Sequence, residues 1–104
     1  VFRHYQQRLR PDFSTFFGAL LEGKGLTRRS FAELIRPQIR IRSRRQFGPD
    51  AWKDVPDNDA VQLSYGLGVG VLQTPYGPAF FKEGHDDGWG HYAIGFPDRN
   101  VGIV

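Results

Sequence analysis

The sequence predicts a small α+β domain in which two N-terminal helices precede antiparallel β-hairpins. Apolar residues recur at helical spacing in the first third of the chain, strand-like segments fill the last part, and turn residues separate them. Helices that come first and hairpins that follow are typical of an α+β arrangement. With 104 residues and a hydrophobic fraction of 39%, the chain is large enough for one modest packed core.

The first helix is expected between Pro11 and Gly25. Its apolar residues follow the i, i+3, i+4, i+7 and i+8 pattern of one helix face: Phe13, Phe16, Phe17, Leu20 and Leu21. Pro11 and Asp12 suit a first helical turn, where a proline loses no hydrogen bond and an acid meets the positive end of the helix dipole. Gly25 suits the C-terminal stop.

The second helix is expected to begin after Thr27, whose hydroxyl can cap the free N–H groups of the first turn. Three residues form its buried stripe: Phe31, Leu34 and Ile35. Pro37 ends the helix, because the residue before a proline is disfavoured in the helical conformation. The helix therefore lies between Thr27 and Pro37.

The remaining chain is expected to form β-structure around one long loop. Residues 38–42 alternate in polarity and predict a short strand at a sheet edge, and the polar residues 43–59 predict a loop. The later segments are predicted as a strand over 61–74, a turn over 75–77, a return strand over 79–82, and a second hairpin whose strands, 89–96 and 101–104, are joined through 97–100.

Three glycines at a spacing of two fall within the predicted strand 61–74. A dinucleotide-binding loop would place its third glycine at position 71, which is Val71, and would continue into a helix. Glycines that alternate along a strand instead leave one face free of side chains, so that another element can pack closely. We therefore expect Gly66, Gly68 and Gly70 to serve packing and not phosphate binding.

Charge is unevenly distributed along the chain. Residues 1–45 contain eleven basic residues against three acidic ones, a net charge of +8, and residues 46–104 contain three against eight, a net charge of −5. A basic half can indicate a nucleic-acid-binding face, but no nucleic-acid-binding motif accompanies the arginines. Two simpler explanations are available. The oppositely charged halves of one domain can attract each other, or the arginines can cover the solvent-facing sides of helices. The chain has no cysteine, which excludes a disulfide scaffold and a thiolate metal site.

The segment with the most chemical information is Lys82-Glu83-Gly84, followed by a loop of glycine and aspartate and by Trp89 at the start of the next strand. This layout resembles the C-terminal active-site strand of the penicillin-recognising serine hydrolases, the family of class C β-lactamases, D,D-peptidases and related esterases. There, a Lys-Thr-Gly triplet precedes a glycine-rich loop and a strand that begins with glycine and an aromatic residue. The resemblance extends upstream to the Tyr-Gly-Leu-Gly segment at 65–68 and to both helices, over most of residues 12–104.

The resemblance implies a fold and roles for individual residues. Residues 1–104 would be a single partial domain, the C-terminal segment of a β-lactamase or transpeptidase-like sandwich of sheet and helices. Lys82 would add positive charge beside the nucleophile, and Gly84 would let substrate lie against the strand. The backbone N–H of His85 would be one oxyanion-hole donor, and Glu83 and Trp89 would contact substrate. No metal or other cofactor is expected.

The nucleophile itself is absent from these residues. The family uses a Ser-x-x-Lys motif, in which helical spacing places the lysine beside the serine as a base, together with a Tyr-x-Asn or Ser-x-Asn motif. Neither occurs between Val1 and Val104. The chain also has no methionine and ends in an apolar run. We therefore expect a piece of a longer protein that is not catalytic alone and whose missing N-terminal part carries the serine.

Glu83 departs from the family pattern, because a threonine or serine usually contacts the substrate carboxylate there. A carboxylate at this position would repel that group, which favours an esterase, amidase or peptidase over an efficient β-lactamase. Two histidines and two acids in the hairpin are also candidate metal ligands: His85, Asp86, Asp87 and His91. An Asp-Asp-Gly turn explains the acids equally well, and no third histidine is nearby.

Two functions follow from these observations. The first is the C-terminal portion of a serine hydrolase that acts on a small-molecule or peptide acyl substrate. The alternative is a non-catalytic basic module that binds nucleic acid or another anionic partner through the arginine-rich residues 1–45. No apolar run is long enough to span a membrane. The isolated piece is expected to self-associate through sheet edges and helix faces that the rest of the parent would cover.

Overall fold

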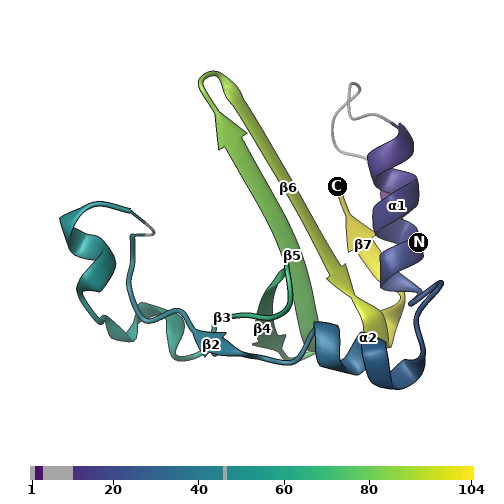
Figure 1. Ribbon diagram of the computed structural model, residues 1–104, viewed down its shortest axis with the longest axis horizontal. Coiled ribbons are helices and arrows are strands. Elements are labelled where there is room, and N and C mark those ends of the chain that lie inside the picture. Colours follow the sequence, from purple (N-terminus) through teal and green to yellow (C-terminus); the bar gives the residue numbers. More distant parts are fainter. Residues whose placement is uncertain (1, 4–10, 46) are drawn as a thin grey trace.

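The computed structural model describes residues 2–3, 11–45 and 47–104 and confirms the α+β class (Figure 1). Two helices, α1 (Pro11–Leu21) and α2 (Arg28–Leu34), precede most of a seven-stranded sheet of order β1-β7-β6-β5-β4-β3-β2. Its strands are β1 (Phe2–Arg3), β2 (Ile39–Arg40), β3 (Ser64–Tyr65), β4 (Gly70–Thr74), β5 (Gly77–Asp86), β6 (Trp89–Phe96) and β7 (Val101–Ile103). All neighbouring strands are antiparallel except β1 and β7.

Both predicted helices form, and local capping sets their ends. The Thr27 hydroxyl accepts a hydrogen bond from the Ser30 N–H at 3.1 Å, as expected for the N-cap of α2. Helix α1 ends at Leu21, earlier than the stop expected at Gly25. The reason is Gly23, which takes a left-handed conformation with φ of 69° and turns the chain two residues sooner.

The prediction of one strand over 61–74 was wrong. The structure has two short strands, β3 and β4, joined by a tight turn that the Gly66 N–H closes on the Val69 carbonyl at 2.8 Å. The turn is anchored to the end of α2, because the Leu67 N–H donates to the Leu34 carbonyl at 2.9 Å. A Cβ at Gly66 would lie 2.5 Å from the same carbonyl oxygen, and Gly68 has φ of 81°. These two glycines therefore serve the turn.

Gly70 serves the packing role expected for the glycine series, as Gly66 does against the end of α2, whereas Gly68 does not. The Phe81 ring of the neighbouring strand lies where a Cβ at position 70 would be. Phe81 thereby lies over Gly70 of β4 and is 8% exposed. On its other side it stacks on Tyr92 of β6, with ring centroids 5.9 Å apart. An aromatic floor thus covers the sheet face that carries Phe81.

The β5–β6 hairpin is longer than expected. The return strand predicted over 79–82 extends from Gly77 to Asp86, and the two-residue turn Asp87-Gly88 leads directly into β6, whose bounds match the predicted 89–96. Lys82 and its neighbours therefore lie within a strand and not at its end. The hairpin to β7 forms as predicted, through a 3-10 helix, η3 (Pro97–Arg99). Strand β1, which pairs parallel to β7, was not predicted.

The core lies between the two helices and one face of the sheet. Phe80, which is fully buried, is in contact with Phe17 of α1 and Phe31 of α2, at ring-centroid distances of 5.1 and 6.3 Å. The other buried residues of this cluster are Leu21, Val69, Val71, Ala93 and Val104. Because side chains alternate along a strand, Phe81 and Glu83 point to the opposite face, away from the helices.

The long loop predicted over 43–59 contains two 3-10 helices, η1 (Pro49–Trp52) and η2 (Pro56–Asn58). Together with β2 it forms an arm that stands apart from the β5–β6 hairpin (Figure 1). The arm is fixed by a bridge between Ser43 and Asp54. Within the described part of the chain, no helix has the length and apolar character needed to cross a membrane.

Candidate functional site

The upper half of strand β5 has an open edge. Strand β4 begins at Gly70, which pairs with Phe81, so β4 covers only the first half of β5. Among the described strands, residues 82–86 pair with β6 alone. In Figure 1 this part of the hairpin rises beyond the rest of the sheet. The predicted active-site triplet therefore lies at the start of an unpaired strand edge.

The register shows which backbone groups face this edge. Gln73 N–H donates to the Val61 carbonyl at 2.7 Å, so odd-numbered residues of β4 face β3 and even-numbered ones face β5. The even-numbered residues of β4 pair with odd-numbered residues of β5, which direct their N–H and C=O groups toward β4. Beyond Phe81 this alternation directs the N–H groups of Glu83 and His85 to the open edge.

The three residues of the triplet line one groove. The groove encloses about 430 Å³. It is lined on one side by Lys82, Glu83 and Gly84, and otherwise by Phe47, Tyr65, Phe81 and residues 68–70. A Cβ at Gly84 would meet no atom within 4 Å, so the strand surface there is open to a ligand. Lys82 and Glu83 are both exposed and point to opposite faces of the sheet.

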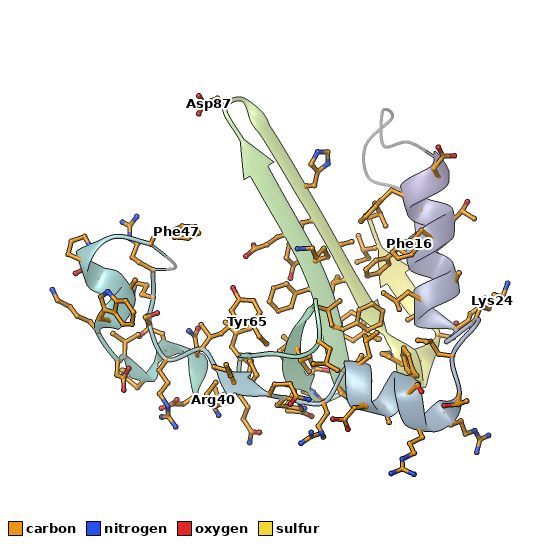
Figure 2. All side chains as sticks on the ribbon, in the orientation of Figure 1. Phe16, Lys24, Arg40, Phe47, Tyr65 and Asp87 are labelled. Carbon is orange, nitrogen blue, oxygen red and sulfur yellow. The ribbon has the colours of Figure 1, made fainter. Side chains whose placement is uncertain are left out.

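Trp89 and His85 are placed by their backbones. Trp89 pairs with Asp86 beside the two-residue turn, at the tip of the hairpin. The side chains of His85, Asp86 and Trp89 lie outside what the structure describes. Asp87 stands at the extreme tip of the hairpin (Figure 2), and no cluster of three metal-ligating side chains occurs among the described residues.

A second groove adjoins the first and was not predicted. It encloses about 530 Å³ between the arm and the sheet, and it shares Tyr65, Phe81 and Glu83 with the first groove. Figure 2 shows Tyr65 pointing into the space between the arm and the hairpin. The four arginines of 40–45 and Trp52 also line it. The alternating arginines were visible in the sequence, but their position beside the triplet depends on the fold of the arm.

Tyr92 provides an electrostatic probe of this face. Its ring is half-exposed and stacks on Phe81, while its main-chain neighbour across the ladder is Glu83. Two effects raise the pKa of the Tyr92 hydroxyl above its ordinary value of 10.0. Burial of the hydroxyl is the larger effect, and the negative charge of Glu83 is the smaller one.

We expect the Tyr92 hydroxyl to ionise at higher pH than a free tyrosine, and Glu83→Gln to lower its pKa partway. The folded state holds the Tyr92 proton more tightly than the unfolded chain does. The resulting contribution to the free energy of unfolding is therefore fully present below the pKa of tyrosine in the unfolded chain, and it is lost as pH rises through the higher pKa of Tyr92 in the folded protein. The pKa of Tyr92 is measured by following phenolate absorbance as a function of pH and subtracting the titration of the Tyr92→Phe variant from that of the unsubstituted chain. Glu22→Gln is the control and should leave it unchanged; an ordinary pKa for Tyr92 contradicts the expectation.

Comparisons of the chain with models of protein families, with curated proteins and with solved structures find no match in any of the three. The open strand edge and the two neighbouring grooves are therefore the features from which a function is inferred.

Proposed function

We propose that this chain is the C-terminal portion of a serine hydrolase of the β-lactamase, D,D-peptidase and esterase type. The observation that carries the proposal is the open edge of β5, where Lys82, the bare Gly84 and the outward N–H of His85 follow one another along a strand that pairs with β6 alone. An acyl substrate can lie along such an edge and accept hydrogen bonds from it, as an added strand would.

Each of these residues has a role in acyl transfer. A serine from the rest of the parent attacks the acyl carbonyl and passes its proton to a neighbouring base, and the leaving group departs with a proton as the acyl-enzyme forms. The Lys82 ammonium lowers the pKa of nearby groups and so keeps the base unprotonated. The His85 N–H donates to the oxygen of the tetrahedral intermediate, as the second donor beside the serine's own N–H.

Glu83 favours particular substrates. Its carboxylate points to the sheet face opposite Lys82, lines both grooves and is exposed. A substrate carboxylate held directly at this position would be repelled. We therefore place esters, amides and peptides ahead of penicillins as substrates, with the acyl carbonyl at the strand edge and the rest of the molecule in the grooves.

The test is intact-mass spectrometry of the parent protein after exposure to benzylpenicillin and to 4-nitrophenyl acetate. We expect a single acyl adduct, formed faster with the ester. In Lys82→Ala, adduct formation should slow by about tenfold or more, because a change of one pKa unit in the base alters its unprotonated fraction about tenfold. Lys24→Ala, which removes an exposed lysine of the α1–α2 connection, is the matched control.

Two results would count against the proposal. One is the absence of an adduct from either reagent, and the other is an equal rate in Lys82→Ala and in the parent. The 104-residue chain alone, which has no Ser-x-x-Lys motif, should form no adduct and serves as the blank. An adduct on the isolated chain would mean that a different nucleophile is at work.

A further inference from the structure

The groove beside the arm is lined by more positive than negative charge. Four arginines of the segment 40–45 line it, against two carboxylates, those of Asp54 and Glu83. Arg40 and Arg44 are each in an ion pair, with Asp59 at 3.0 Å and Asp57 at 2.8 Å. Neither Arg42 nor Arg45 forms an ion pair with any described residue, so these two guanidinium groups are available to a ligand.

The backbone around Arg42 is held in place by hydrogen bonds from Val55 and Asn58. The Asn58 side-chain amide donates to the carbonyls of Ile41 and Ser43, both at 3.2 Å. The Val55 N–H donates to the Arg42 carbonyl at 2.7 Å. A fixed backbone lowers the entropy lost when the side chains close on a ligand, so the segment is pre-organised for binding.

Aromatic side chains face the same groove. Trp52 is 89% exposed and Tyr65 is 41% exposed, while Phe81 forms the buried floor. A solvent-exposed indole beside guanidinium groups is a stacking surface for a planar ring. The space of about 530 Å³ is in the range of small-molecule sites.

The two grooves are neighbours on one face of the sheet and share Tyr65, Phe81 and Glu83. Ile39, Tyr65, Gly70 and Phe81 follow one another in register, from β2 to β5. Three strand spacings separate the first from the last, which is about 14 Å. A ligand whose acyl carbon lies at the β5 edge can therefore extend over Tyr65 toward the arginines.

We infer that Arg42 and Arg45 recognise an anionic group on the far end of the hydrolase's substrate, and that the substrate is an aromatic acyl compound with a carboxylate remote from its reacting carbonyl. The inference rests on the proposed function, which supplies the reaction at the strand edge.

Binding is tested on the 104-residue chain with two unreactive amides, 4-phenylbutyramide and its analogue with a carboxylate at the para position of the ring. Titration calorimetry should show at least about tenfold tighter binding of the carboxylated amide, since a hydrogen-bonded charge pair is stronger than a neutral contact. The double variant Arg42→Gln/Arg45→Gln should abolish this preference. The double variant Arg42→Lys/Arg45→Lys, which keeps the positive charges, should keep part of it.

Arg28→Gln/Arg29→Gln is the matched control, because it removes the same charge from exposed residues of α2 that do not line the groove. Circular dichroism of each variant shows whether the fold is kept. Equal binding of the two amides, or an equal loss in the control, would overturn the inference. So would tighter binding of a single-stranded oligonucleotide with the same dependence on Arg42 and Arg45.

The corresponding 4-nitrophenyl esters separate this inference from the proposed function. Faster acylation of the parent by the carboxylated ester, lost in Arg42→Gln/Arg45→Gln, supports both. Acylation at equal rates by both esters keeps the proposed function and overturns the inference. No acylation, together with arginine-dependent binding of the carboxylated amide, supports an anion site in this groove and overturns the proposed hydrolase.

Discussion

Replacing His85 by proline is expected, on the proposed hydrolase function, to slow acyl-enzyme formation in the parent by about 10²–10³-fold, the loss that follows removal of one oxyanion-hole donor. Proline has no N–H, and the N–H at position 85 faces the open edge of β5 and not the ladder with β6. Proline is tolerated at strand positions of this kind, so the sheet should remain folded. Stopped-flow measurement of 4-nitrophenolate release gives the rate.

Two further variants locate the effect in the backbone. His85→Ala keeps the N–H and removes the imidazole, so its rate should stay close to that of the parent. Gly84→Pro removes an N–H that faces β6, and this variant should be destabilised because a ladder hydrogen bond is lost. If His85→Pro acylates at the parent rate, the N–H at position 85 is not in the oxyanion hole. Equal losses in His85→Pro and His85→Ala would assign the role to the side chain.

Truncation of Phe80 to alanine is expected to lower the free energy of unfolding by about 3–5 kcal/mol, the usual cost of removing a buried aromatic ring. Phe80 is fully buried and its ring joins both helices to the sheet, through Phe17 and Phe31. Urea denaturation of the 104-residue chain measures the change. Because a loss of this size can unfold a small domain outright, Phe80→Leu provides a milder step of the same sign.

Phe16→Ala is the control for this experiment. Phe16 belongs to the same helix as Phe17, but its side chain is 64% exposed, so its truncation should change stability by less than about 1 kcal/mol. Similar losses at Phe80 and Phe16 would show that the core is not where the sheet and helices place it.

The helices were predictable because their signals are local. The apolar spacing from Phe13 to Leu21 and the capping hydroxyl of Thr27 lie within the elements that they specify. The strand predicted over 61–74 failed because its break depends on a distant contact. Gly66 and Leu67 turn the chain against the Leu34 carbonyl, about thirty residues earlier, and no pattern within 61–74 reports that contact.

The candidate site shows the same division. The Lys-x-Gly triplet was singled out by its resemblance to a known active-site strand, its role stays a prediction, and its three residues line one groove of the structure. The open edge could not be predicted, because it depends on β4 beginning at Gly70 and not earlier. The free arginines could not be predicted either: all four in 40–45 look alike in the sequence, and only the fold pairs two of them with Asp57 and Asp59.

Phe81 occupies a position that limits how this protein can diverge. Its ring fills the space over Gly70, stacks on Tyr92 and forms part of the wall of both grooves. A substitution there alters the walls of two grooves and the packing of three strands together. Changes in the shape of the grooves are therefore more accessible to evolution through the rim, at Phe47, Trp52 and the arginines, where one side chain can change while the floor is inherited intact.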